Sequence, residues 1–95
     1  MTLGIQVDPI ARKEFRQATC WHEAESAGRG KSFAKAVNTQ MRTIAQQPDR
    51  YPLAGKSVRQ SPVPGWDYYS IYYRVYDDHI RILSIFHASR EPKDW

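Results

Sequence analysis

The residues of this sequence that are most able to do chemistry lie in its last third. If Asp77 and Asp78 form a two-residue turn, Arg74 stands directly opposite Arg81 on the neighbouring strand. Like charges in that position destabilise a sheet by up to about 1 kcal/mol unless an anion lies between them. The pair therefore favours an anionic ligand or partner. The simpler interpretation is that both guanidinium groups extend into water or pair with a carboxylate.

A second group of polar side chains follows where the last strand leaves the sheet. It consists of His87, Ser89, Arg90 and Lys93, with the rings of Tyr68 and Tyr72 on the same face. Cations beside stacking rings suit RNA or a charged protein groove. Cleavage of RNA through its 2′-OH would need a base, an acid and cations around the phosphate, and His87 is the candidate for acid or base. Because no second titratable group is fixed beside it, a histidine hydrogen-bonded at a strand end is the simpler interpretation.

The remaining reactive residue types exclude several kinds of site. His22 and His79 have no second ligand at metal spacing, so the sequence predicts no metal site and no cofactor. Phosphate-binding glycine loops, Rossmann glycine patterns and nucleophile elbows are absent from the sequence. Cys20 is the single cysteine, which excludes a disulfide framework, and we expect it to be a small buried hydrophobe.

Two amphipathic helices are expected to position these groups. Asp8 is a predicted N-cap with Pro9 at the first helical position, after a weakly alternating first strand. Apolar residues then recur every three or four positions in residues 11–27 and 31–47, and Gly28–Gly30 separates the two runs. The expected buried positions are Ala11, Phe15, Ala18, Trp21 and Ala24 in the first helix, and Phe33, Val37, Met41, Ile44 and Ala45 in the second, with Lys35, Asn38, Gln40 and Arg42 outside the second stripe.

Strands are expected after a proline-rich loop over residues 48–55. Residues 56–60 are a short strand and residues 68–87 a hairpin. The predicted inward pairs are Tyr76–His79, Val75–Ile80, Tyr73–Ile82, Ile71–Ser84 and Tyr69–Phe86, and the outward pairs are Arg74–Arg81, Tyr72–Leu83, Ser70–Ile85 and Tyr68–His87. The predicted fold class is α+β, with an N-terminal strand, an antiparallel helical hairpin and a three-stranded antiparallel meander, both helices packing on one sheet face.

Composition bounds the kind of protein. The 95 residues suffice for one domain, residues 1–95, and 25% of them are charged. No long apolar run or signal-peptide pattern occurs, so we expect a cytoplasmic protein without membrane contact. The net charge of +4 favours nucleic acid, a nucleic-acid machine or an acidic protein as partner.

The order of these features resembles the RelE/ParE toxin superfamily of type II toxin-antitoxin systems, and within it the ParE-like branch. The resemblance covers nearly the whole chain and rests on "FRQATCWHEAESAGRGKSFAKAV", "IAQQPDRYPLAGKSVRQ" and "YYSIYYRVYDDHIRILSIFHASREPKDW". It implies a toxin that forms a hetero-oligomer with a small antitoxin, whose disordered, acidic C-terminal part folds on binding. The antitoxin is expected to contact Phe15, Trp21, Tyr68, Tyr72, Arg74 and Arg81.

The resemblance also implies two alternative targets. ParE-like members block DNA gyrase, and for that activity the expected target surface is Arg74, Arg81, His87, Ser89, Arg90 and Lys93. RelE-like members cut mRNA in the ribosomal A site, and in that case Arg90 and Arg59 would stabilise charge while His87 acts as acid or base. Ser70 stands where the nuclease pattern has an arginine, and no tyrosine follows the last strand. A third alternative is an inactive homologue that only binds antitoxin.

Overall fold

The expected α+β class is confirmed, with more strands than the sequence predicts. The computed structural model describes residues 2–88, and within them the chain forms two helices and five strands. The elements are β1 (Gly4–Val7), α1 (Pro9–Glu25), α2 (Arg29–Gln46), β2 (Leu53–Gly55), β3 (Val58–Pro62), β4 (Tyr69–Val75) and β5 (His79–His87).

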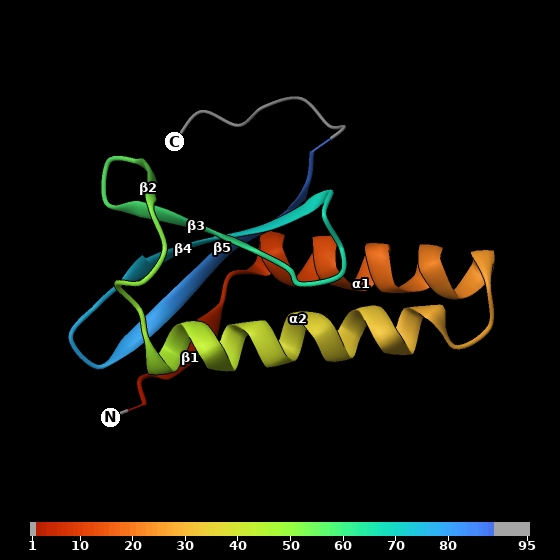
Figure 1. Ribbon diagram of the computed structural model, residues 1–95, viewed down its shortest axis with the longest axis horizontal. Coiled ribbons are helices and arrows are strands. Elements are labelled where there is room, and N and C mark those ends of the chain that lie inside the picture. The colour runs from red at the N-terminus through yellow and green to blue at the C-terminus, as the bar shows by residue number, and fades with distance from the viewer. Residues whose placement is uncertain (1, 89–95) are drawn as a thin grey trace.

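The described strands form a five-stranded sheet in the order β1-β5-β4-β3-β2. β1 runs parallel to β5, whereas the other neighbouring strands are antiparallel. The two helices lie side by side and cover one face of the sheet (Figure 1). The expected three-stranded meander corresponds to β3, β4 and β5. In the structure the sheet is extended by β2 at one edge and by β1 at the other. Leu53–Gly55, expected to be loop, instead pairs with β3. The pairing is possible because Pro48 and Pro52 both lie before the strand, so none of its N–H groups is missing.

The turn end of the β4–β5 hairpin has the predicted register. Tyr76 N donates to His79 O at 2.8 Å, and Arg74 stands opposite Arg81. Beyond Tyr73 the predicted register is wrong by one residue. The observed pairs are Tyr72–Ser84, Ile71–Ile85, Ser70–Phe86 and Tyr69–His87. A β-bulge that leaves Leu83 as the extra residue explains the shift, and it brings Ser84 and Ile85 toward α1.

The buried stripe of α2 is confirmed, and that of α1 is partly wrong. All five predicted positions of α2 are buried, together with Gln40, whose Nε2 donates to Tyr51 Oη at 2.8 Å and Ser61 Oγ at 2.7 Å. In α1 the buried residues are Ala11, Glu14, Ala18 and His22. Trp21 is 56% exposed, and Cys20 is exposed instead of buried. The stripe is rotated because Glu14 and His22 find hydrogen-bond partners inside the fold, which hydropathy alone does not register.

A close helix–helix turn fixes where α1 and α2 meet. Gly28 adopts φ 86°, a conformation that glycine reaches without strain. Glu23 accepts hydrogen bonds from Gly28 N at 2.9 Å and Gly30 N at 3.1 Å, which pairs N–H groups at the start of α2. A Cβ on Gly30 would lie 2.5 Å from Thr19 O, so the two helices approach too closely here for a side chain.

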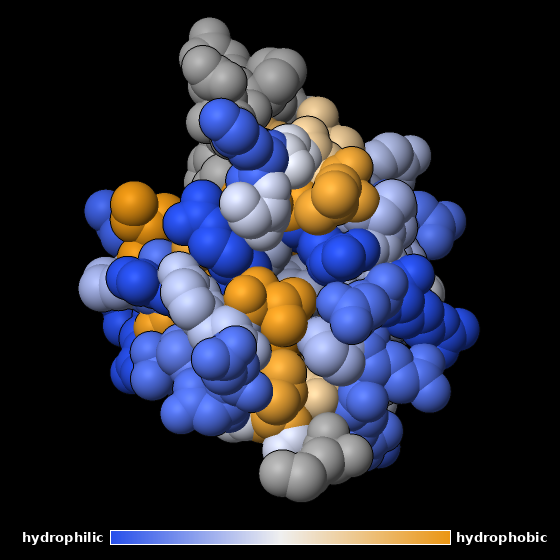
Figure 2. All heavy atoms as spheres, turned by 90° about the vertical axis from the view of Figure 1, so that its left-hand side faces the viewer, coloured by the Kyte–Doolittle hydropathy of each residue, from blue (hydrophilic) through white to orange (hydrophobic). Residues whose placement is uncertain are grey.

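The surface at the β4–β5 turn is mixed in character. Figure 2 views the molecule from that side, and apolar residues form a narrow strip between hydrophilic ones. Ile5 of β1 and Leu53 of β2 are 37% and 60% exposed. Such a pattern is ordinary for a protein surface. Neither helix of the described chain has the length and apolar character needed to span a bilayer.

Candidate functional site

The described residues of the predicted target surface lie in two groups at opposite ends of the β4–β5 hairpin. Arg74 and Arg81 are near the turn, whereas His87 pairs with Tyr69 at the far end. Arg74 and Tyr69 are five residues apart, about 17 Å along an extended strand. Ser89, Arg90 and Lys93 lie outside the described residues.

An aspartate offsets the repulsion between Arg74 and Arg81 by pairing with Arg81. Arg81 Nε donates to Asp8 Oδ1, and this bond raises the pKa of Arg81. Asp8 precedes α1 but makes no capping hydrogen bond with its side chain. Arg74 differs, because its Nε is buried and has no hydrogen-bond partner within residues 2–88. The like charges therefore face each other as predicted, and a carboxylate from the strand–helix junction balances one of them.

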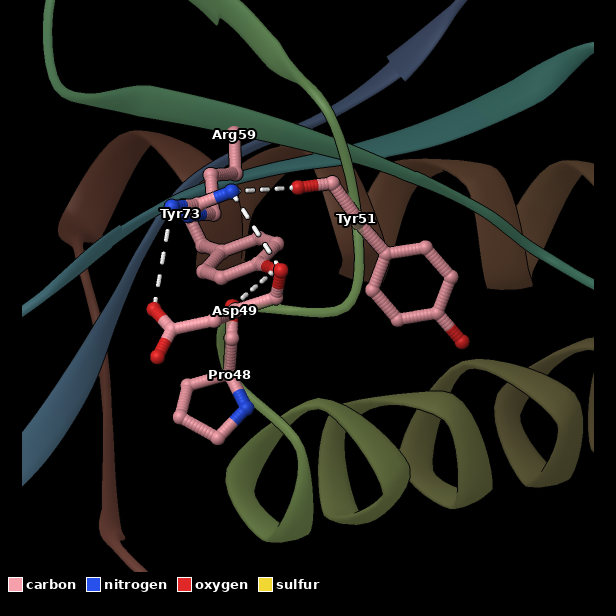
Figure 3. A network of polar contacts seen from close by, with 5 residues as sticks. All are labelled: Pro48, Asp49, Tyr51, Arg59 and Tyr73. Carbon is pink, nitrogen blue, oxygen red and sulfur yellow. Dashed lines mark hydrogen bonds and ion pairs between the residues drawn. The ribbon is translucent and has the colours of Figure 1, made fainter.

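Arg59 holds a loop in place. Its Nη1 donates to Tyr51 O at 2.7 Å, and its Nη2 lies 3.7 Å from Asp49 Oδ1 (Figure 3). In the same network Tyr73 Oη donates to Pro48 O at 2.7 Å, and burial raises the pKa of Tyr73 to about 12. The guanidinium thus satisfies a carbonyl of the loop that follows α2.

Arg59 and His87 do not approach each other. Arg59 pairs with Tyr73 and His87 pairs with Tyr69. Tyr73 and Tyr69 are four residues apart, which is about 13 Å along an extended strand. Because the guanidinium of Arg59 is bonded to Tyr51 O and lies near Asp49, the two side chains are not arranged around one phosphate-sized site.

A pocket of about 440 Å³ lies where α1, the start of α2, the β3–β4 loop and the end of β5 meet. Its lining combines aromatic rings with ionisable groups from segments that are distant in sequence. The lining residues are Trp21, His22, Arg29, Gly65, Trp66, Asp67, Tyr68, Tyr69 and His87. We call this the aromatic pocket, and it falls within the usual size range of small-ligand sites.

His22 forms part of the inner wall of the aromatic pocket. It is only 3% exposed and shares a hydrogen bond of 2.9 Å between Nε2 and Tyr69 Oη. Its ring centroid lies 4.9 Å from that of Trp66 and 5.0 Å from that of Phe33. Its Nδ1 is buried with no hydrogen-bond partner within residues 2–88. The sequence signal that could have placed His22 in the core is its position four residues after Ala18, which is buried.

The environment of His22 favours the neutral ring. Burial contributes most to lowering the pKa of His22, electrostatic interactions with Arg29 and His87 act in the same direction, and Glu25 opposes them. A neutral imidazole has one donor and one acceptor, so Tyr69 can satisfy one ring nitrogen without bringing a charge into the core.

Acidification below about pH 6.5 is expected to destabilise the fold through His22. The unfolded chain has the ordinary, higher pKa and binds the proton first, so the stability is complete above that pKa and is lost as the pH falls. The slope from this group is at most about 1.4 kcal/mol per pH unit. Urea unfolding of the wild type and of His22→Gln across this pH range isolates the contribution as the difference between the profiles. Parallel profiles would contradict the prediction.

The outer part of the aromatic pocket carries exposed rings. Tyr68 is 70% exposed, and its ring stacks on His87 with centroids 5.8 Å apart. The ring of Tyr69 contacts His87 edge-on at 4.8 Å. Arg29 lies over the ring of Trp66, 5.7 Å from its centroid. Trp66 therefore packs against the core, whereas Trp95 lies outside the described residues.

Comparison with known proteins points to one family. The sequence model of the ParE toxin of the type II toxin-antitoxin system parDE matches residues 5–92. No curated protein gives a significant sequence match.

Solved structures share the fold at low sequence identity. A chain of the chromosomal ParDE toxin-antitoxin system from P. aeruginosa is similar with TM-score 0.79 and 16% identity, over 90% of this chain and 96% of that one. The toxin-antitoxin complex RelBE2 from Mycobacterium tuberculosis is similar with TM-score 0.67 and 14% identity, over 92% and 99% of the two chains. The YoeB dimer from Staphylococcus aureus gives TM-score 0.63 and 17% identity, also over 92% and 99%.

Proposed function

Because this chain belongs to the ParE toxin family of type II toxin-antitoxin systems, we propose that it binds and inhibits DNA gyrase and is neutralised by a cognate antitoxin. Its activity is then one of binding, without bond cleavage. It acts in the cytoplasm, where gyrase is found.

The separation of Arg59 from His87 is the observation that carries this proposal. Cleavage of RNA needs an acid, a base and cations around one phosphate group. Within residues 2–88 Arg59 is engaged with the Pro48–Tyr51 loop, about 13 Å along the sheet from the strand position of His87. The buried histidine His22 has a lowered pKa and shares a hydrogen bond with Tyr69 inside the fold. This arrangement supports binding over catalysis.

Purified toxin is expected to inhibit supercoiling by gyrase at micromolar concentration. Replacing both outward arginines, Arg74→Gln with Arg81→Gln, should weaken inhibition by about tenfold or more, because paired charges at an interface contribute to affinity. The matched control removes two exposed cations of α2, Lys35→Gln with Arg42→Gln, and should change inhibition little. Wild-type protein that leaves both supercoiling and relaxation untouched would end the gyrase proposal.

Ribosome-dependent mRNA cleavage is the second candidate function. The stacked Tyr68–His87 pair favours it, since a ring and an imidazole lie together at one end of the sheet. Primer extension on a translated mRNA in the presence of the toxin tests it, and absence of cuts in the A site would exclude it. An inactive homologue, the third alternative, would leave growth unchanged when expressed without antitoxin.

We propose that the cognate antitoxin binds this protein directly and contacts several of the residues predicted from the sequence. Trp21 and Tyr68 both line the aromatic pocket. Arg74 and Arg81 are paired at the turn end of the hairpin, and Tyr72 lies on the same strand as Arg74. Phe15 is packed against the core, with its ring centroid 6.0 Å from that of Phe33.

A further inference from the structure

Large apolar side chains are left exposed at the rim of the aromatic pocket. Trp21 is 56% exposed and Tyr68 is 70% exposed, although they come from α1 and from the residue before β4. Tryptophan, tyrosine and arginine are the residue types that most often dominate protein-protein binding energy. Here all three types line one concave site, since Arg29 belongs to the same lining.

The inner wall of the aromatic pocket is held rigidly by the fold. The ring centroid of Trp66 lies 5.1 Å from that of Phe33, and the backbone N–H of Trp66 donates to Val63 O at 2.9 Å. Tyr69 N donates to Trp66 O at 2.9 Å, so the β3–β4 loop turns tightly around Gly65, which has φ 83°. A preformed pocket loses little conformational entropy when a side chain enters it.

The charge around the pocket favours an anionic neighbour for the entering group. Arg29 is exposed, and both Arg29 and His87 belong to the lining. Asp67 also lines the pocket but is exposed, and it has no ion pair with Arg29 within residues 2–88. A carboxylate near Arg29 would gain charge-assisted hydrogen bonds from the guanidinium.

We infer that the aromatic pocket is the anchor site for an aromatic or large aliphatic side chain of the antitoxin, with a carboxylate beside it that pairs with Arg29. This inference rests on the proposed antitoxin partnership and adds to it the place and chemistry of the main contact. The apolar side chain packs between the rings of Trp21, Trp66 and Tyr68. The flanking carboxylate sets its orientation.

Binding of the proposed antitoxin, which we expect to be the product of the adjacent gene, tests the anchor directly. Trp21→Ala and Tyr68→Ala should each raise its Kd by about 30-fold or more, as expected for anchor residues. Ile10→Ala and Leu53→Ala remove side chains that are 63% and 60% exposed away from the pocket, and they should leave Kd within about threefold. Thermal unfolding of all four variants checks that each is folded. Wild-type binding with equal Kd values for all four variants would overturn the anchor while leaving the antitoxin partnership standing.

A second matched pair of variants tests whether a carboxylate of the antitoxin pairs with Arg29. Arg29→Gln should slow association and reduce its dependence on ionic strength, whereas Arg42→Gln removes the same charge from the same helix outside the pocket and should not. Equal effects of the two substitutions would reject the carboxylate.

A small probe keeps the pocket chemistry testable without the antitoxin. Millimolar N-acetyl-tryptophan should shift the indole N–H signals of Trp21 and Trp66 in NMR spectra, and the neutral N-acetyl-tryptophanamide should bind about threefold more weakly. Arg29→Gln should abolish that difference. Absence of pocket shifts would refute the anchor chemistry. Failure of the wild type to bind the proposed antitoxin would instead refute the partnership.

Discussion

Replacing Phe33 with alanine is expected to destabilise the protein by about 3–5 kcal/mol, the usual cost of removing a buried phenylalanine ring. Phe33 is completely buried, and its ring centroid lies 4.7 Å from that of Tyr69 and 5.1 Å from that of Trp66. The ring centroid of Phe33 also lies 5.0 Å from that of His22. Because a small domain has only about 5–15 kcal/mol of stability in total, this substitution should shift the urea midpoint strongly.

Two further variants show whether the loss comes from the aromatic cluster. Phe33→Leu retains most of the apolar volume and should cost about 1 kcal/mol. Leu53→Ala, at a side chain that is 60% exposed, should change stability by no more than about 0.5 kcal/mol. An alanine variant at position 33 that is as stable as the one at position 53 would show that the cluster contributes little to stability.

Local sequence patterns were sufficient to predict the buried face of α2 and the strand register close to the hairpin turn. The stripe of α2 from Phe33 to Ala45 is continuous, so its period identifies the buried face. The turn at Asp77–Asp78 fixes the pairing as far as Tyr73 and Ile82, because each next pair follows from the one before. The parallel addition of β1 beside β5 is non-local, and no short-range pattern in the sequence specifies it.

Buried polar groups account for another part of what the sequence did not predict. Gln40 lies inside the fold because Tyr51 and Ser61 supply hydrogen-bond partners from other segments. His22 is buried in the same way through Tyr69, 47 positions away. A hydropathy pattern places such residues at the surface, since their partners are visible only in the folded chain.

The aromatic pocket could be predicted only in part. Trp21 and Tyr68 were each expected to contact the antitoxin, but only the fold brings both to one lining with Arg29. Arg59 was expected near a phosphate, and its bond to Tyr51 O depends on the course of a loop that sequence could not fix. Residue type thus indicated binding character, and topology decided which residues share a site.

Replacing Glu14 with leucine is expected to destabilise the protein by about 3 kcal/mol, because two buried donors would lose their acceptor. Glu14 is 8% exposed, and its Oε1 accepts from Ser84 Oγ at 2.7 Å and Ile85 N at 3.2 Å. The β-bulge beyond Ile82 directs both donors toward α1, so the carboxylate joins helix to sheet where the ladder is irregular. Urea unfolding measures the loss. In a double-mutant cycle with Ser84→Ala, the coupling should be about 1–2 kcal/mol, and zero coupling would show that the bulge is stabilised without this hydrogen bond.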